Sequence, residues 1–375
     1  MRGGRRRVAH VSSAHPWSDN RVHLREAASL ASGGYEVVLI AVDADVDVPD
    51  TGVKVIRLPA RSRLKRLTIG SVHAVVAAHL TKAEVVHLHD PELIWAIPLF
   101  RLTRRRVVFD AHEDLPSQVM DKHYLPSWAR PLVAWFAKLL VFFAGRTSDA
   151  IIAATETIAE SFPRTKVTIV HNYPRLRLTD SEIPGILDRP FEAVYVGGMS
   201  IARGAREMIS MCSSSNFPTG WRLRVAGSTS PASLLDELSA TPGWEKVDYI
   251  GQVSPSDARD MLQRGRVGLI LFQRSRAHLD SLPTKMFEYL AAGIPIIASD
   301  FPRWRDIIER LDCGIVVDET DPDAVARAVA TYNQDPILLQ RHSANARAAS
   351  AGVLNWNHEE PALLELYRSL VLPRR

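Results

Sequence analysis

Short apolar runs alternate with longer amphipathic segments along the whole chain. The runs are rich in Val, Ile and Leu, and residues at helical spacing separate them. Runs that are apolar at nearly every position predict strands buried on both faces, and helix-length segments between them predict parallel sheets covered by helices. Seven predicted strands lie in the first half, at 8–11, 37–42, 53–58, 85–88, 107–109, 151–154 and 167–170, and six in the second, at 193–196, 223–226, 247–250, 267–272, 294–298 and 315–317.

This alternation predicts an α/β protein with two doubly wound, Rossmann-like parallel-sheet domains. It breaks at about 172–191, where Pro, Gly and charged residues cluster. We therefore predict a first domain over 1–175, a linker over 176–191, a second domain over 192–354 and a final helical segment over 355–375. A chain of 375 residues is long enough for two domains with separate cores.

Ligands of such sheets bind beyond the carboxyl ends of the strands, so the residues after each run are candidates for chemistry. The most informative stretch is 280–300. It predicts a loop carrying Asp280 and Ser281, a helix that begins near Pro283 and ends before Gly293, and then a buried strand.

Lys285 and Glu288 lie three residues apart near the start of that predicted helix, so they share one face. A helix amino end attracts phosphate, and Lys285 adds a full positive charge. Glu288 can accept hydrogen bonds from a sugar diol, and Asp280 can reach another part of the same ligand. These groups suit a nucleotide diphosphate with a polar group attached. A surface Glu–Lys pair on an amphipathic helix is the alternative interpretation.

The second half opens with Gly197 and Gly198 directly after a predicted strand, followed by Arg203. Glycines let backbone N–H groups approach a phosphate, and Arg203 can pair with phosphate oxygens. Gly227 follows the next strand, where it would either let a ligand lie close to the backbone or form a tight turn.

His15, Asp19 and Arg21 follow the first predicted strand, which is not followed by a Gly-x-Gly-x-x-Gly motif. The segment therefore argues against a nicotinamide- or flavin-binding domain. Asp19 either borders a ligand cleft or caps the helix predicted over 22–32.

Two further strands lead into polar clusters. His87, His89 and Asp90 follow the fourth run, and His112 and Glu113 follow the fifth. Their spacing matches no single-helix metal motif, so we expect no metal and favour hydrogen bonding to a polyol. For His87 and His89 we expect a buried structural role.

The segment 127–146 is apolar on nearly every side of a predicted helix. A helix of this kind is usually buried, and burial is our expectation. The alternative is a patch that dips into a membrane beside the basic runs. One helical stripe contains Leu132, Trp135, Phe136, Leu139, Leu140 and Phe143.

Composition narrows the protein class. Cys212 and Cys313 lie far apart without metal-ligand spacing, so we expect no disulfide framework and a reducing, cytoplasmic setting. Residues 1–175 carry a net charge of +7 and residues 176–375 carry −3. Basic runs at 2–7, 61–66 and 104–106 could attract anionic lipid or a lipid-linked phosphate. They carry no nucleic-acid fold signature, so we expect no nucleic-acid partner.

The stretch 280–300 resembles the signature of retaining, nucleotide-sugar-dependent glycosyltransferases of family 4 (group 1), which have the two-domain GT-B fold. That signature has two acids separated by seven residues, but this chain has Asp280 where the family usually has Glu. The loop after the strand 193–196 also resembles the family's, except that Gly198 stands where an Arg is common. His15-Pro16, Asp19-Asn-Arg21 and the segment around His112 match family motifs in the same order.

The resemblance implies two facing domains, with the acceptor in the first, the donor in the second and the last helix crossing back to the first. It assigns His112, Arg203 and Asp280 to catalysis. Donor binding falls to Gly197, Gly198, Arg203, Gly227, Ser281, Lys285 and Glu288, and acceptor binding to His15, Asp19, Arg21, Asp90 and Glu113.

The implied reaction is a metal-independent, retaining transfer from a UDP- or GDP-linked sugar, with no cofactor. The leaving phosphate takes the acceptor proton, so no separate base is expected. The acceptor would be a lipid-linked saccharide in cell-surface polymer assembly, at the membrane periphery, or a natural product. The alternatives are a GT-B coupling enzyme or epimerase, and a non-catalytic nucleotide-sugar-binding protein.

Overall fold

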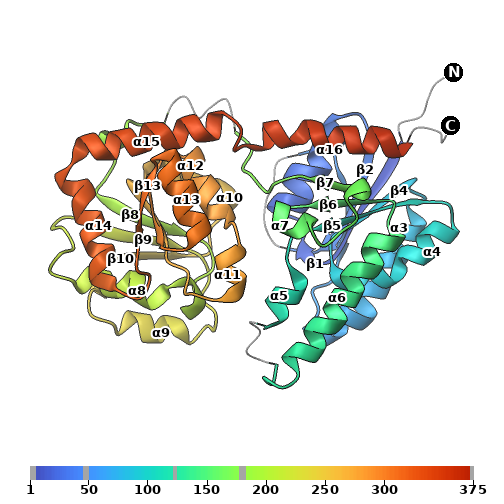
Figure 1. The fold of residues 1–375 in the computed structure, drawn as a ribbon, viewed down its shortest axis with the longest axis horizontal. Helices are drawn as coiled ribbons and strands as arrows, with labels where there is room; N and C mark the ends of the chain where they lie inside the picture. Colours follow the sequence, from blue (N-terminus) through green and yellow to red (C-terminus); the bar gives the residue numbers. More distant parts are fainter. Residues whose placement is uncertain (1–5, 45–49, 121–124, 177–182, 372–375) are drawn as a thin grey trace. The chain divides into compact units, whose positions relative to one another are not determined.

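The structure, a computed structural model, describes residues 6–44, 50–120, 125–176 and 183–371, without the side chains of Asp280 and Val371. The chain divides into two compact units. Unit 1 contains Met1–Asn172 and Trp356–Arg375, and unit 2 contains Tyr173–Asn355 (Figure 1). Most of the basic run 2–7 and part of the predicted linker, 177–182, lie outside the described residues.

Unit 1 is built on a seven-stranded sheet with the order β3-β2-β1-β4-β5-β6-β7, and every described strand pair is parallel. Each of the seven predicted runs corresponds to one strand, because continuous Val, Ile and Leu suits a strand covered on both faces. The strands are β1 Arg7–Pro16, β2 Glu36–Val42, β3 Lys54–Leu58, β4 Val85–Leu88, β5 Arg106–Ala111, β6 Ala150–Ala153 and β7 Val167–Ile169.

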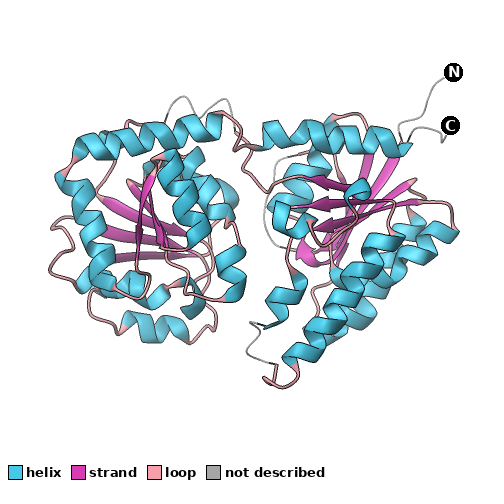
Figure 2. Cartoon of the chain, viewed as in Figure 1, coloured by secondary structure: helices cyan, strands magenta, loops and turns pink. Residues whose placement is uncertain are grey.

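Helices cover both faces of this sheet (Figure 2). On one face Ala74, Ile97 and Ala144, from α3, α4 and α6, pack against the strands. On the other face Leu30 and Leu363, from α1 and α16, close a second core. The helices of unit 1 are the π-helical η1 Asn20–Ala27, α1 Ala28–Ser32, α2 Arg63–Lys65, η2 Arg66–Gly70, α3 Ser71–Leu80, η3 Pro91–Ala96, α4 Ile97–Leu102, α5 Leu115–Met120, α6 Arg130–Thr147, α7 Glu156–Ala159, the short η4 Arg164–Lys166 and α16 Trp356–Val371.

Unit 2 is built on a six-stranded parallel sheet with the order β10-β9-β8-β11-β12-β13. Its strands are β8 Glu192–Val196, β9 Arg222–Ala226, β10 Val247–Gly251, β11 Val267–Ile270, β12 Ile296–Ser299 and β13 Gly314–Val317. The predicted runs 267–272 and 294–298 each extend beyond their strand. The two-domain, doubly wound fold class is confirmed.

The helices of unit 2 also lie on both faces of its sheet. Val325 and Val329 of α14 pack into one core, and Phe287 and Leu290 of α12 pack into the other. The helical segments are η6 Ile186–Asp188, η7 Ile201–Arg203, α8 Ala205–Ser210, η8 Met211–Ser213, α9 Leu234–Ser239, η9 Trp244–Lys246, α10 Pro255–Arg264, α11 Arg276–Asp280, α12 Thr284–Ala291, α13 Pro302–Leu311, α14 Pro322–Gln334 and α15 Pro336–Ala351.

Three expectations about single elements are wrong. The described end of the predicted linker is part of unit 2, because Arg189 is buried and donates to the carbonyls of Gly265 and Ala292. Asp280 ends helix α11 instead of lying on a loop. The strand predicted over 8–11 is too short, because β1 continues to Pro16, which pairs with Val42 after a bulge.

The expected burial of the helix 127–146 is also wrong. Helix α6 faces the core of unit 1 with its small residues, Ala134, Ala137, Ala144 and Gly145. A Cβ on Gly145 would lie 3.1 Å from Pro163, so the helix packs closely at that point. The large apolar side chains of α6 are left on the solvent side.

Candidate active site

The strand order of each unit reverses at one point, which we call the switch point. Ligands of doubly wound sheets bind there. In unit 2 this point lies between β8 and β11, and in unit 1 between β1 and β4. The predicted site residues lie after these strands or on the helices that follow.

Two cations meet at the switch point of unit 2. Gly197 and Gly198 follow β8 directly, and Arg203 donates from Nη1 to the Gly198 carbonyl at 3.1 Å. A Cβ on Gly197 would clash with Nζ of Lys285, so the ammonium lies directly over this glycine. The structure therefore brings Gly197, Gly198, Arg203 and Lys285 together, as the sequence predicted.

Aromatic rings line this pair of cations. The Arg203 guanidinium carbon lies 5.8 Å from the centroid of Phe272, and Lys285 Nζ lies 5.2 Å from that of Tyr195. Among the described residues neither cation forms an ion pair with a carboxylate. Burial lowers the pKa of Lys285 to about 8, with Arg203 adding to the effect and Glu288 opposing it. An anion placed here would offset the cost of keeping Lys285 charged.

Gly227 supports this turn from behind. Its φ is +144°, and a Cβ there would clash with the carbonyl of Gly197. Its missing side chain lets two backbone segments approach each other, which is a packing role. A contact between Gly227 and a ligand stays a prediction.

Helix α12 begins beside the same turn. Pro283 is its N-cap and gives no side-chain hydrogen bond to the first turn, as expected for a proline that opens a helix. The helix ends before Gly293, whose φ is +64°. Glu288 is half-buried on the second turn, three residues after Lys285, and its carboxylate accepts no hydrogen bond from a described residue.

The approach to α12 is fixed by residues that sequence reasoning missed. Trp304 donates from Nε1 to the Ser281 carbonyl at 2.7 Å. Ser281 itself donates from Oγ to the His278 carbonyl at 3.0 Å, so its hydroxyl already serves the end of α11. Tyr289 packs its ring where a side chain on Gly268 would stand. No spacing in the sequence marks these contacts, because they join separate elements.

In unit 1 the segment after β1 is held by carboxylates. Asp19 caps η1, with Oδ1 accepting from the backbone N–H groups of Arg21 and Val22 at 2.8 Å each. Its Oδ2 lies 3.5 Å from Nδ1 of His15, and Nε2 of His15 lies 3.4 Å from Asp90. The capping role that the sequence left open for Asp19 is confirmed, and the acceptor role stays a prediction.

His15 is a cation in this setting. Burial lowers the pKa of His15, but a hydrogen bond with Asp19 and the charges of Asp90, Asp19 and Glu113 outweigh burial and raise it to about 9. Burial likewise raises the pKa of Asp19, but the hydrogen bond and charge of His15 hold it well below its usual range.

Asp90 joins the ends of β1 and β4. Its Oδ2 accepts from Ser12 Oγ at 2.8 Å and from the backbone N–H groups of Ser13 at 2.6 Å and Ala14 at 3.1 Å. These contacts and the one with His15 at 3.4 Å mean that the carboxylate is occupied by the protein, and an acceptor contact by Asp90 stays a prediction. Glu113 is exposed.

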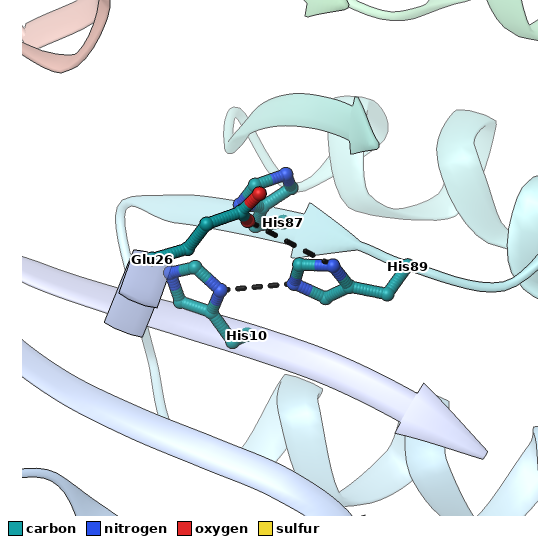
Figure 3. Close-up of side chains that lie close together, drawn as sticks. All are labelled: His10, Glu26, His87 and His89. Carbon is teal, nitrogen blue, oxygen red and sulfur yellow. Dashed lines mark hydrogen bonds and ion pairs between the residues drawn. The ribbon is translucent and has the colours of Figure 1, made fainter. Parts of the chain in front are cut away.

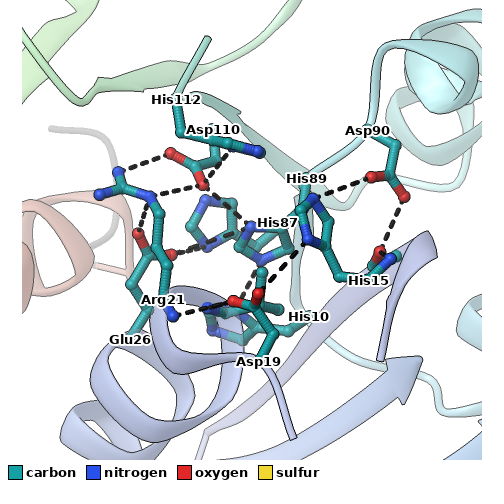
Figure 4. A network of polar contacts seen from close by, with 12 residues as sticks. His10, His15, Asp19, Arg21, Glu26, His87, His89, Asp90, Asp110 and His112 are labelled. Atoms are coloured by element: carbon teal, nitrogen blue, oxygen red, sulfur yellow. Dashed lines mark hydrogen bonds and ion pairs between the residues drawn. The ribbon is translucent and has the colours of Figure 1, made fainter. Parts of the chain in front are cut away.

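Asp110, at the end of β5, is the centre of a polar network (Figure 4). Its carboxylate accepts from Arg21 Nη2 at 2.7 Å and Nε at 3.0 Å, from His89 Nδ1 at 3.1 Å and from His112 Nδ1 at 3.1 Å. Burial raises the pKa of Asp110, but the charges of Arg21 and His112 and its hydrogen bonds hold it well below the usual range. Asp110 is thus an acceptor only.

Arg21 and His112 both contact Asp110, but they differ in how far their side chains are exposed. Arg21 is buried and also donates to the Val170 carbonyl at 3.1 Å. An acceptor contact by Arg21 is therefore not supported, because its guanidinium is enclosed by the protein. His112 keeps 16% of its side chain exposed, and its ring lies edge-on to that of His15 at 5.1 Å. Asp110 lies two residues before His112, but it was not singled out from the sequence.

Beneath Asp110 lie four fully enclosed side chains (Figure 3). His10, Glu26, His87 and His89 place one ligand atom each within 4.8 Å of one another, so they could hold a metal ion. Hydrogen bonds use some of the same atoms: His10 Nδ1 with His89 Nε2 at 2.9 Å, and His87 Nδ1 with Tyr367 Oη at 2.9 Å. The buried structural role expected for His87 and His89 is confirmed.

Burial disfavours charge on the side chains of this cluster. It lowers the pKa of His10 and of His87 well below the usual value, with neighbouring histidines adding to the effect. It raises the pKa of Glu26 well above the usual value, with Asp110 adding to the effect and Arg21 opposing it. Glu26 Oε1 also lies 3.1 Å from Nε of Arg21, so the cluster is joined to the network around Asp110.

Comparison with protein-family models identifies the family of this chain. The family model described as glycosyl transferases group 1 matches residues 177–349, and the model described as glycosyl transferase 4-like domain matches residues 20–172. The chain belongs to the group 1 glycosyltransferases. The two matches together cover all of the sheet of unit 2 and the sheet of unit 1 from β2 onward.

Relatives of this glycosyltransferase match it over nearly their whole length. The phosphatidyl-myo-inositol mannosyltransferase of Mycobacterium leprae (strain TN) is 22% identical over 369 residues, covering 92% of this chain and 91% of the relative.

Among solved structures, sucrose-phosphate synthase from Thermosynechococcus elongatus is similar with a TM-score of 0.73 and 17% identity, covering 98% of this chain and 99% of that chain. HepE of Anabaena in complex with UDP-glucose has a TM-score of 0.71 and 13% identity, covering 97% and 99%. These similarities place the glycosyltransferase in the GT-B fold.

Proposed function

We propose that this glycosyltransferase moves a sugar with retention of configuration from a UDP- or GDP-linked donor to an acceptor hydroxyl, without a metal. The observation that carries the proposal is the pair Arg203 and Lys285 at the switch point of unit 2. Two cations there have no carboxylate partner among the described residues, and one has a depressed pKa. A diphosphate supplies the missing negative charge.

The reaction begins with the bond between the anomeric carbon and the leaving phosphate oxygen. As that bond breaks, negative charge grows on the diphosphate, and Arg203, Lys285 and the amino end of α12 stabilise it. The acceptor oxygen forms its bond to the anomeric carbon on the face that the phosphate leaves. The acceptor proton passes to a leaving-phosphate oxygen, so the protein needs no separate base. Glu288 holds the ribose of the donor, and Asp280 holds its sugar.

His112 is the residue of unit 1 that we assign to a sugar hydroxyl. Its Nδ1 is engaged with Asp110 at 3.1 Å, which fixes the orientation of the ring, so Nε2 is the nitrogen that we assign to the ligand. His15, a cation beside it, is suited to a phosphate or a negatively charged group of the acceptor.

We further propose that the acceptor is a lipid-linked saccharide and not a soluble natural product. The support is the large set of apolar side chains that unit 1 leaves on its surface. A soluble acceptor does not require such a surface, whereas an acceptor anchored in a bilayer does.

A transfer assay tests the proposal. The chain is incubated with UDP- and GDP-linked hexoses and with saccharides on short-chain lipid carriers, without added metal. We expect release of nucleoside diphosphate and a new glycoside, and proton NMR should give it the anomeric configuration of the donor. An inverted product contradicts retention. Isomerised or coupled nucleotides identify an epimerase or coupling enzyme, and binding without turnover identifies a non-catalytic protein.

A further inference from the structure

Helix α6 is built with its small residues inside and its large apolar residues outside. The core side contains Ala and Gly, and the solvent side contains Trp, Phe and Leu. The stripe of six large residues recognised in the sequence is 38% to 54% exposed in every member: Leu132, Trp135, Phe136, Leu139, Leu140 and Phe143. A core-facing stripe would be the reverse, so the arrangement is not explained by packing within unit 1.

Neighbouring helices continue this surface. Helices α3, α4 and α6 cover the same face of the seven-stranded sheet, because their inner residues share one core. They lie next to one another in Figure 1. We call the exposed apolar residues of this side the outer face of unit 1: Leu64, Leu67, Ile69, Val72, Val76, Leu80, Trp95, Leu99, Leu102, Trp128, Phe142 and the stripe of α6.

Positive charge surrounds the outer face. The segments 61–82, 95–106 and 125–147, which form it, contain 12 Lys and Arg and no Asp or Glu. The whole chain has a net charge of only +4, so the remainder carries −8. Glu92, in η3 between these segments, is paired with Arg66 at 2.8 Å. Lys65, Arg104 and Lys138 are exposed, and the guanidinium carbon of Arg146 lies 5.3 Å from the ring centroid of the exposed Phe142.

Topology connects the outer face with the acceptor side of unit 1. Helix α6 runs between β5 and β6 of a parallel sheet, so its amino end lies at the carboxyl edge, where β5 leads into His112. Helix α5 follows His112 and packs against α6 through Val119 and Ala134. The exposed stripe begins at the edge that carries the predicted acceptor residues.

We propose that the outer face of unit 1 docks on an anionic lipid bilayer. Apolar and aromatic side chains insert at the level of the headgroups, and the surrounding Lys and Arg bind anionic lipid. None of the described helices is long and apolar enough to cross a membrane, so the contact is peripheral. A second copy of the chain is a poor occupant, because a two-fold interface would bring exposed cations such as Lys65, Arg104 and Lys138 of one copy against those of the other.

Docking on the bilayer does not depend on catalysis. The role that we give it, delivery of a lipid-linked acceptor, rests on the proposed function. With the outer face on the bilayer, the edge that carries His15 and His112 stands close to the headgroups. A saccharide on a lipid carrier then reaches that edge without leaving the membrane.

Vesicle sedimentation tests the docking with the full chain and no nucleotide sugar. We expect binding to vesicles of 70% phosphatidylcholine and 30% phosphatidylglycerol, and at least tenfold weaker binding to pure phosphatidylcholine. The variant Trp135→Gln/Phe136→Gln/Leu139→Gln should lose at least tenfold in binding while its melting temperature and nucleoside diphosphate affinity stay unchanged. The variant Lys65→Glu/Lys138→Glu should lose the preference for anionic vesicles.

A matched control carries the same number of exposed apolar-to-Gln changes in unit 2: Ile250→Gln/Ile337→Gln/Val353→Gln. It should bind vesicles as the wild type does. The docking is overturned by a wild type that stays in the supernatant, or by stripe variants that still sediment. A dimer that the stripe variant turns into monomers, without vesicle binding, assigns the surface to a second copy instead. Vesicle binding without transfer activity refutes the proposed function alone.

Discussion

His112 donates a hydrogen bond from Nδ1 to Oδ2 of Asp110 at 3.1 Å. The same oxygen accepts a hydrogen bond from Arg21 Nε at 3.0 Å. The buried guanidinium therefore holds the carboxylate in place, and the carboxylate in turn orients the imidazole of His112. This relationship links the buried cluster of unit 1 to His112, whose side chain is 16% exposed. Asp110 is thus a positioning residue that acts through His112.

Replacing Asp110 by Asn should separate positioning from binding. The change frees the orientation of His112, and a small misplacement of a contacting group costs roughly 10- to 100-fold in kcat. Nucleoside diphosphate affinity should stay within about twofold, because the diphosphate contacts belong to unit 2. Buried Arg21 keeps its ion pair with Glu26 at 3.1 Å but loses the one with Asp110, so the free energy of unfolding should also fall, by up to about 3–5 kcal/mol. Steady-state kinetics and chemical denaturation measure both effects.

Asp149→Asn is the matched control for this prediction. Asp149 is a nearly buried carboxylate paired with Arg106 at 3.0 Å, and it precedes β6 at the opposite edge of the same sheet. It should lose stability while kcat is preserved. Equal losses of kcat in the two variants would show that Asp110 acts only through stability.

Gly197→Ala and Gly198→Ala should differ strongly. A Cβ on Gly197 would clash with the Lys285 ammonium, and the backbone there has φ +130°. A Cβ on Gly198 would stand 3.1 Å from Nη1 of Arg203, the end of a flexible side chain that can move. We expect Gly197→Ala to weaken nucleoside diphosphate binding at least tenfold and Gly198→Ala to weaken it less than threefold. Isothermal titration gives both constants, and equal losses would place the cations elsewhere.

The charged state of His15 should appear in the pH dependence of stability. Its pKa rises from 6.5 to about 9 on folding, so its contribution is complete below pH 6.5 and disappears as pH rises through 9. The upper limit is about 3 kcal/mol, at 1.36 kcal/mol per pKa unit. Wild type should exceed His15→Gln in free energy of unfolding at pH 6, and the difference should shrink by pH 10. A difference that is constant with pH would contradict the ion pairs with Asp19 and Asp90.

Metal removal should leave transfer unchanged. The proposed chemistry balances the diphosphate charge with Arg203 and Lys285, so EDTA should alter kcat/KM by less than about twofold. Elemental analysis of the purified protein tests whether the buried histidines hold a metal ion. One zinc or iron per chain that Glu26→Gln abolishes would assign His10, Glu26, His87 and His89 to a metal site. Loss of activity in EDTA would contradict the metal-independent mechanism.

The sequence predicts the features that depend on the residues of one helix or one strand alone. All strands follow from runs of Val, Ile and Leu, and α12 follows from Pro283, Gly293 and apolar residues at helical spacing. Contacts between separate elements leave no such pattern. The hub role of Asp110 depends on Arg21, His89 and His112 meeting at the ends of different segments.

Helix α6 shows why an apolar pattern alone did not predict which of its side chains are buried. Its stripe of large residues has a helical period, but so does the row of Ala134, Ala137 and Ala144 on the other side. A sheet that the helix approaches closely accepts the small row and leaves the large one outside. Hydrophobicity cannot decide between these two faces without the packing partner.

Isothermal titration of UDP and GDP tests the central claim most directly, with wild type, Arg203→Ala, Lys285→Met and Glu288→Ala compared at pH 7.5. Removing a charge-assisted contact costs about 1.5–3 kcal/mol, so we expect roughly 10- to 150-fold weaker binding for the two cation variants and a smaller loss for Glu288→Ala. Because the free pKa of Lys285 is about 8, wild-type affinity should also fall by up to about twentyfold between pH 7.5 and 9.5, and Lys285→Arg should remove that dependence. Unchanged affinity in the Arg203 and Lys285 variants would contradict a diphosphate site at the switch point of unit 2.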